Sequence, residues 1–477
     1  MLDVECFSSG ECRNWHVDPK PLKPANYDLS MSKKTAFRAA SYVEPNQPVG
    51  RVLELFAGVG GFRIGLSRAG LATVASNQYE PGEKAQYASR CYEANFKAGE
   101  HYNMLIEDLI TSAETGAIVL PKNVDVLVGG FPCQDYSVAK SLSTSTGIEG
   151  KKGVLWWQIL RLMDFYKEEN QKTFPFVFLE NVDRLLKSPV AQRGRDFAVM
   201  VQELMNRGYA VEWRVVSASD YGFPQRRIRV FILAKYIAKD DLISESFAAD
   251  QITRDGILAK SFPSTPTEGF EMQEVKLFKT TLQTSETFGV GRKSSPFANA
   301  GFAAAGRVWT QKVTAQYSGR MYTLADVLEA ESDVPDSFIV SDEDFVQKWK
   351  PLKDGGSYQR KDKATGFEYL YSEGKMTCPD DLQKPARTIL TAEGGTSASR
   401  FKHIIRIGNR YRRLMPLELE RLSGFPDNHT SKLSNGDETS DIKRAFFLGN
   451  ALVVGLVERV GHEIAKALAE KSTLRSE

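Results

Sequence analysis

The chain is poor in cysteine and histidine, and it contains no long apolar run. Among 477 residues there are five cysteines and five histidines. The cysteines are scattered without metal-ligand partners at usable spacing, so we expect neither a disulfide framework nor a zinc site. No run approaches the roughly 18 apolar residues of a membrane span, and the N-terminus lacks the apolar stretch of a signal peptide. We therefore expect a cytoplasmic protein without metal or membrane contact.

An excess of charge of one sign is also lacking. Lys and Arg number 62 against 60 Asp and Glu, so the formal net charge is only +2. Any nucleic-acid role must then rest on local patches rather than on a global field. Hydrophobic residues make up 42% and charged residues 26%, as in ordinary globular proteins. The length allows two domains, or one large domain with insertions.

Apolar runs alternate with helical stretches from residue 51 to about residue 236. We predict strands at 52–55, 72–76, 124–128, 176–179, 211–216 and 230–234, with helices between them such as 153–167 and 195–206. This alternation favours an α/β fold with a doubly wound, Rossmann-like parallel sheet. The rhythm is lost after about residue 246, and an amphipathic helix is predicted at 452–470. We expect four parts: an extension at 1–48, a first domain at 49–245, a smaller, mostly β or irregular domain at 246–440, and a C-terminal helix at 441–477 that returns to the first domain.

A Gly-rich turn follows the first predicted strand, where residues 53–62 read LELFAGVGGF. Glycines let a backbone approach a ligand closely, with the N-terminus of the next helix behind it. The full dinucleotide pattern G-x-G-x-x-G is absent, which disfavours NAD, and a tight turn without a ligand is the alternative. Gln78 and Glu80 follow at the end of the second strand, where ribose hydroxyls are usually held. We place Asp108 at the end of a third strand, where a carboxylate can accept from an adenine amino group.

A thiol stands at the tip of the turn after strand 124–128, where residues 129–137 read GGFPCQDYS. Backbone N–H groups in such a turn can stabilise a thiolate, the nucleophilic form of Cys133; a small buried cysteine is the alternative. Glu180 ends a further buried strand at the same sheet edge. A carboxylic acid whose pKa is raised by desolvation there can donate to a base nitrogen, and a helix cap is the alternative.

Two basic segments complete the pattern. In QRRIR at 225–229, alternation sends Arg227 and Arg229 to one face, and two arginines facing a cleft suit phosphate or a base carbonyl. Residues 384–413 hold eight Lys and Arg against one acid, Glu393, interleaved with Gly and Ser. This composition suits a loop that meets a phosphate backbone. Solvated surface is the alternative for both segments.

In their order and spacing these motifs resemble the DNA (cytosine-5) methyltransferase family of bacterial restriction–modification systems. The resemblance covers about 51–236 and 412–465. It implies a Rossmann-like, S-adenosylmethionine-dependent methyltransferase core in the first domain and target recognition in 246–440. It also implies that residues 449–454, GNALVV, pack back on the cofactor site. The family usually has an acidic residue at the position of Gln78, although an amide can still hydrogen-bond a hydroxyl.

The resemblance assigns three sets of residues. The catalytic set is Cys133, Glu180, Arg229 and Arg227. The cofactor set is Phe56, Ala57, Gly58, Gly60, Gly61, Gln78, Tyr79, Asp108, Leu109, Pro132, Leu155, Asn450, Ala451 and Leu452. The DNA-binding set is Ser137, Arg227, Thr388, Ile389, Gly394, Gly395 and Arg400. In addition, the Ser/Thr/Gly-rich run at 138–152 is expected to act as a mobile lid.

The implied activity is methyl transfer from S-adenosylmethionine to C5 of a cytosine flipped out of double-stranded DNA, through a covalent Cys133 adduct, leaving S-adenosylhomocysteine. Such a monomeric, nucleoid-associated enzyme protects host DNA from a cognate restriction endonuclease, which need not bind it. A tRNA cytosine-5 methyltransferase, a catalytically silent DNA-binding regulator and an NAD-dependent oxidoreductase are the alternatives. The long middle region favours DNA over tRNA. Intact Cys133, Glu180 and Arg229 argue against a silent regulator.

Overall fold

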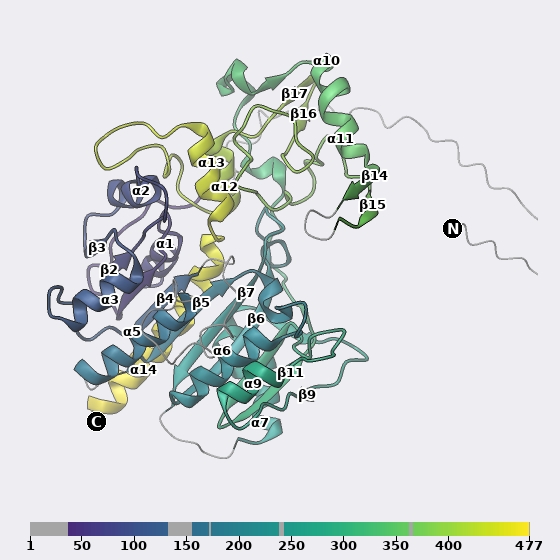
Figure 1. Ribbon diagram of the computed structural model, residues 1–477. Coiled ribbons are helices and arrows are strands. Elements are labelled where there is room, and N and C mark those ends of the chain that lie inside the picture. Colours follow the sequence, from purple (N-terminus) through teal and green to yellow (C-terminus); the bar gives the residue numbers. More distant parts are fainter. Residues whose placement is uncertain (1–36, 132–154, 171–172, 238–242, 362–365, 477) are drawn as a thin grey trace, which may run out of the picture.

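The computed structural model describes residues 37–131, 155–170, 173–237, 243–361 and 366–476. Figure 1 shows a lower lobe built around a large sheet and an upper lobe of short strands and helices. None of the helices in these ranges is long and apolar enough to cross a membrane. The positions of Cys133, Pro132, Ser137 and the expected lid at 138–152 lie outside the described residues.

The lower lobe contains a ten-stranded sheet in the order β3-β2-β1-β4-β5-β7-β6-β10-β11-β9. Its strands are β1 (Gly50–Leu55), β2 (Leu71–Asn77), β3 (Glu100–Tyr102), β4 (Val126–Gly130), β5 (Phe176–Asn181), β6 (Tyr209–Ser217), β7 (Ile228–Tyr236), β9 (Gln273–Glu274), β10 (Ala300–Ala304) and β11 (Arg307–Gln311). The first five in that order run parallel, which confirms the predicted doubly wound α/β core. β7 runs antiparallel to both β5 and β6. The short link at 218–227 leaves no room for the crossover that parallel pairing requires.

Helices cover both faces of this sheet. They are α1 (Gly61–Arg68), α2 (Tyr87–Asn95), α3 (Ile106–Glu114), α5 (Leu155–Asn170), α6 (Arg195–Asn206) and α14 (Val454–Ser476). Alternate residues of β1 enter two cores, since Leu53 packs in the core with α3, α5 and α6 while Val52 packs in the core with α1 and α14. α14 covers most of the predicted C-terminal helix, beginning at Val454 rather than at 452, and returns to the first domain (Figure 1).

The expected boundary at 245/246 is wrong, because the chain beyond it extends the same sheet. β10 pairs with β6, and β11 and β9 follow outward. The segment also contributes α7 (Glu245–Asp250), α8 (Ile257–Ser261), α9 (Thr281–Thr287), β8 (Ser264–Pro266) and β12 (Val313–Ala315). A Cβ on Gly301 would lie 1.9 Å from the ring of Trp213 on β6, so the close approach of β10 requires glycine. Residues up to about 315 therefore belong to the lower lobe.

The upper lobe is formed mainly by residues 324–450. Its elements are β13 (Ile339–Val340), β14 (Gly356–Lys361), β15 (Glu368–Glu373), β16 (Ile405–Ile407), β17 (Arg410–Arg412), α10 (Asp342–Asp344), α11 (Lys350–Asp354), α12 (Pro416–Ser423) and α13 (Asp441–Asn450). Short 3-10 or π turns occur in both lobes. In the lower lobe they are η3 (Asp183–Lys187), η4 (Ala218–Tyr221) and η5 (Gln251–Asp255), and in the upper lobe they are η6 (Leu324–Val327), η7 (Glu331–Asp333), η8 (Asp336–Phe338) and η9 (Phe345–Trp349). The described part of the N-terminal extension docks on the core: Phe37 packs against Phe223 and Tyr322.

Candidate active site

A pocket of about 450 Å³ lies at the carboxyl-terminal edge of β1, β2, β4 and β5. Twelve of the residues assigned from the sequence line it: Phe56, Ala57, Gly58, Gly61, Gln78, Tyr79, Glu180, Arg227, Arg229, Asn450, Ala451 and Leu452. Its size is that of a small-molecule site. One cavity thus joins the Gly-rich turn, the Glu180 strand end and the segment that precedes α14.

The Gly-rich turn is held open toward this pocket. Gly58 has a φ of +54°, and a Cβ there would meet nothing within 4 Å, so the space beside it is free for a ligand. Gly60 does not line the pocket and is needed for a different reason, because a Cβ there would lie 2.2 Å from the Phe96 ring. The Gly58 N–H donates to Oε1 of buried Gln78 at 2.8 Å. The side chain of Gln78 therefore fixes the turn as well as facing the pocket.

Three further residues of the expected cofactor set do not line the pocket. β3 ends at Tyr102, and Asp108 lies exposed in the first turn of α3. Leu109 packs in the hydrophobic core, and Leu155 packs against that core from the start of α5. The apolar run that suggested a longer third strand is the start of α3, whose buried positions continue with helical spacing. The adenine contact expected of Asp108 is therefore corrected.

Glu180 and Arg229 form an ion pair at the pocket wall. Arg229 Nε lies 2.8 Å from Glu180 Oε1, and both side chains are largely buried. Parallel pairing of β4 with β5 sets Gly130 opposite Glu180. A Cβ on Gly130 would lie 3.3 Å from Glu180 Oε2, so this second oxygen faces the end of β4. The chain leaves β4 toward the Cys133 turn from this position.

Asn181 lines the pocket but was not among the residues assigned from the sequence. Its side-chain amide donates to the carbonyl oxygen of Phe131 at 2.9 Å, and its Oδ1 accepts from the Val182 N–H at 2.8 Å. The first bond ties Phe131, the last residue described before Cys133, to the end of β5, and the second fixes the Asn181 side chain. Gly130, Phe131, Phe447 and Gly449 also line the pocket and were not assigned.

Arg227 lines the pocket but does not reach solvent. Only 1% of it is exposed, and it donates to the carbonyl oxygens of Ile389 at 3.3 Å and Gly449 at 3.0 Å. Burial, with the neighbouring Arg229, lowers the pKa of Arg227. Its expected role in DNA binding is corrected: the guanidinium joins the lower lobe to two segments of the upper lobe.

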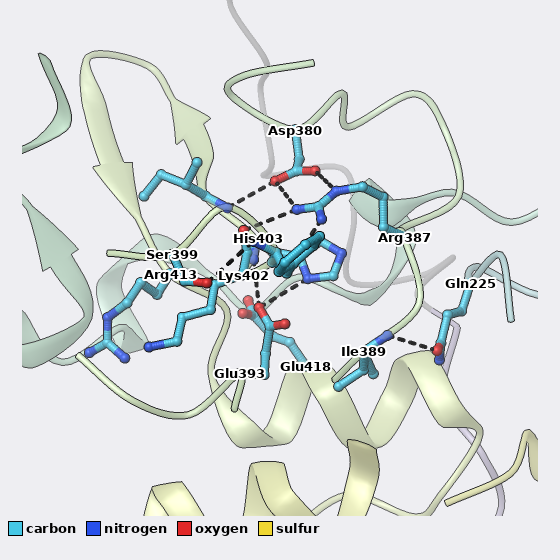
Figure 2. A network of polar contacts seen from close by, with 12 residues as sticks. Gln225, Asp380, Arg387, Ile389, Glu393, Ser399, Lys402, His403, Arg413 and Glu418 are labelled. Carbon is cyan, nitrogen blue, oxygen red and sulfur yellow. Dashed lines mark hydrogen bonds and ion pairs between the residues drawn. The ribbon is translucent and has the colours of Figure 1, made fainter. Parts of the chain in front are cut away.

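Most of the basic stretch at 384–413 is used inside the upper lobe (Figure 2). Arg387 pairs with Asp380 at 2.8 Å. The ammonium of Lys402 donates to the carbonyl oxygens of Gly395 and Ser397. Arg412, with no exposed surface, forms a two-bond pair with Glu418. Arg413 donates to the carbonyl oxygen of Ser337.

The expected DNA-binding residues in this stretch also contact protein. Thr388 donates its hydroxyl to the Arg226 carbonyl at 2.6 Å, and the N–H of buried Ile389 donates to Gln225 Oε1 at 3.2 Å. Arg400 pairs with Glu373 at 3.3 Å. Gly394 and Gly395 allow close packing, since a Cβ would lie 2.6 Å from the Asp441 carbonyl oxygen and 2.9 Å from Lys402 Nζ, respectively. Of these five residues only Ile389 is fully buried, so the DNA contacts of Thr388, Gly394, Gly395 and Arg400 stay predictions, while Arg406 and Arg410 are exposed in the same stretch.

Comparison with known proteins places this geometry in one family. Residues 50–466 match the C-5 cytosine-specific DNA methylases. The chain is 42% identical to the type II methyltransferase M.Sau3AI of Staphylococcus aureus over 87% of this chain and 95% of that protein. It is 32% identical to M.HhaI of Haemophilus parahaemolyticus over 41% of this chain and 51% of that protein. The crystal structure of the S. pombe Dnmt2 methyltransferase covers 88% of this chain and 99% of that one, with a TM-score of 0.52 and 16% identity, which shows a shared fold.

Proposed function

The chain belongs to the C-5 cytosine-specific DNA methylase family, and from this premise we propose how its pocket methylates DNA. The protein is a sequence-specific DNA cytosine-5 methyltransferase of the restriction–modification type. The family implies S-adenosylmethionine as methyl donor. One observation carries the proposal: a single cavity joins the Gly-rich turn to the Glu180–Arg229 pair.

The residues of the pocket fit S-adenosylmethionine. The open side of Gly58 and the segment Asn450–Leu452 would hold its amino-acid end, while Phe56 and Tyr79 offer aromatic surface to the adenine. Gln78 Oε1 already accepts from the Gly58 N–H. The Gln78 amide nitrogen and the Glu80 carboxylate, which also lines the pocket, are therefore the groups that can hydrogen-bond the ribose. Burial raises the pKa of Glu80. When bound, S-adenosylmethionine would supply an electrophilic methyl group beside Glu180 and Arg229.

The chemistry proposed for the chain's own residues begins with Cys133. Its thiolate adds to C6 of cytosine and makes C5 nucleophilic. The entering base separates Glu180 from Arg229, which lie 2.8 Å apart in its absence. Glu180, once protonated, donates its proton to N3, and Arg229 donates a hydrogen bond to the ring carbonyl. Once C5 carries the methyl group, a base removes the C5 proton. The C5–C6 double bond then re-forms and expels the Cys133 thiolate.

A cytosine ring inside a duplex cannot be reached by these groups, so we infer that the base is flipped into the pocket. The upper lobe at 324–450 is proposed to read the DNA sequence, with exposed Arg406 and Arg410 toward the duplex. Buried contacts from Arg227 to Ile389 and Gly449 keep the lobe in register with the pocket. We propose that the enzyme acts as a monomer and methylates the same DNA sequence that a cognate restriction endonuclease cleaves.

Bisulfite sequencing tests this function directly. DNA from cells without other cytosine methylases, expressing the wild-type protein, should carry 5-methylcytosine at one recurring sequence. Glu180→Gln should abolish the mark, because the amide cannot supply a proton to N3. Glu107→Gln is a matched control, since Glu107 is exposed on α3 and does not line the pocket. Absence of the mark in the wild type, or methylation of tRNA from the same cells instead, would contradict the proposal.

A further inference from the structure

A basic surface begins where the pocket ends. Val182 lines the pocket, and η3 follows it directly with exposed Arg184 and Lys187. Arg193 lies half-buried on the loop that leads to α6. Because β5 delivers the chain to the pocket edge, Arg184 and Lys187 follow the pocket lining directly on η3, and Arg193 lies on the same connection to α6; we call this connection the lower-lobe rim.

The segment that extends the sheet brings two further cations to the same rim. Gln192 Nε2 donates to the Glu286 carbonyl at 3.0 Å, and Gln192 forms a β-bridge with Val290. Ser295 donates its hydroxyl to the carbonyl oxygen of Leu186 in η3. The loop between these contacts carries exposed Arg292 and Lys293.

The backbone of the loop before α6 packs closely against the backbone of the loop after α9. A Cβ on Gly289 would lie 2.6 Å from the carbonyl oxygen of Arg193, and a Cβ on Gly194 would lie 2.7 Å from Ser295 Oγ. Glycine on both sides of the junction lets the inserted loop seat against the loop before α6. The two loops that carry the cations are therefore packed side by side, although they are about 100 residues apart in the chain.

These cations differ from Arg195, the other basic residue in the same loop region. Arg195, two positions after Arg193, pairs with Asp196 at 2.8 Å. In the parts of the chain that the structure describes, no comparable ion pair engages Arg184, Lys187, Arg193, Arg292 or Lys293, and only Asp183 and Glu286 add negative charge within 183–193 and 286–293. Clustered like charges repel one another, and a polyanion relieves that repulsion.

We propose that Arg184, Lys187, Arg193, Arg292 and Lys293 form a phosphate-binding surface that holds the backbone of the duplex on the lower-lobe side of the pocket. The proposal rests on the DNA substrate proposed above and goes beyond it by giving the inserted segment a role. Phosphate contacts position a protein on DNA without reading its sequence. This surface therefore sets affinity and orientation, and the upper lobe sets the methylated sequence.

Salt-dependent binding tests the proposal. Arg292→Gln/Lys293→Gln and, separately, Arg184→Gln/Lys187→Gln are compared with wild type on a random-sequence duplex by fluorescence anisotropy. The slope of log affinity against log salt should become shallower by about 0.9 for each phosphate that the variant no longer neutralises. The matched control is Lys122→Gln/Lys235→Gln, two exposed lysines at the opposite edge of the sheet, before β4 and near the end of β7. This control should keep the wild-type slope.

The outcomes separate this inference from the proposed function. If both rim variants keep the wild-type slope and affinity, the phosphate-binding surface is wrong even though the wild type methylates DNA. If a rim variant changes which sequence is methylated, the surface reads bases and the inference is also overturned. If the wild type itself methylates no DNA, the proposed function fails first. Unchanged thermal unfolding of both variants checks that the exposed substitutions leave the fold intact.

Discussion

Replacing Arg412 should destabilise the protein rather than lower its affinity for DNA. Arg412 lies in β17 with no exposed surface. It donates to Glu418 at 2.8 and 2.9 Å and to Glu331 at 2.8 Å. Although burial lowers its pKa, these carboxylates outweigh that effect and raise it. Glu418 also accepts from the backbone N–H groups of Met415 and Glu329, so its charge is fixed inside the lobe.

Arg412→Leu leaves the Glu418 carboxylate buried without its cation. Removing one partner of a buried pair costs about 3–5 kcal/mol. We expect a clear fall in the thermal unfolding midpoint, measured by circular dichroism and by a probe in the upper lobe. Arg410→Leu is the matched control: Arg410 is exposed two residues earlier on the same strand, so its stability should change by less than about 0.5 kcal/mol. Wild-type stability of Arg412→Leu with a shallower salt slope of DNA binding would refute the structural role.

Three further predictions concern the cofactor turn, a buried acid and the upper lobe. Gln78→Glu should bind S-adenosylmethionine as tightly as wild type or more tightly in calorimetry, because a carboxylate still accepts from the Gly58 N–H and bonds hydroxyls more strongly; clear weakening would remove Gln78 from the ribose site and favour another group. Glu54 accepts from Tyr92, and burial raises its pKa from 4.5 to about 7, so the folded state retains a proton that the unfolded state releases. Stability should therefore fall as pH rises between about 4.5 and 7, and Glu54→Gln should flatten that slope in thermal unfolding; an unchanged slope would contradict the assignment. Grafting residues 324–440 onto a related methylase should transfer the methylated sequence, and a folded chimera that keeps its original sequence would show that recognition lies elsewhere.

The sequence was sufficient to predict four of the five parallel strands, with β3 the exception, and most of the residues that line the pocket. Apolar runs located β1, β2, β4 and β5, and motifs at the ends of parallel strands must meet at one sheet edge. The outward extension by β10 was not visible, because its residues AGFAA carry no alternation. Only the packing of Gly301 against Trp213 reveals why the strand lies there.

Charge composition failed for a different physical reason. The window 384–413 looked almost free of acids, yet the carboxylates that neutralise it lie outside it in sequence. Asp380, Glu373 and Glu418 pair with Arg387, Arg400 and Arg412, respectively. A local count of charges cannot distinguish an internal ion pair from a free surface cation, whereas burial and partner distances can. The opposite case is given by the cations on η3 and on the loop at 290–295. No sequence motif singled them out, yet the structure exposes most of them without an ion pair among the described residues.

Covalent trapping tests the central claim most directly. The C5 proton must leave before Cys133 can, and fluorine at C5 cannot leave as a cation, so duplex DNA with 5-fluorocytosine at the methylated position should stall with the enzyme bonded to C6. The adduct should survive denaturing electrophoresis, require S-adenosylmethionine, map to the peptide that contains Cys133, and disappear in Cys133→Ser. Burial raises the pKa of Cys91 to about 12, which keeps that thiol protonated and unreactive. Binding of the substituted duplex without an adduct, or an adduct that maps to Cys91, would contradict the account.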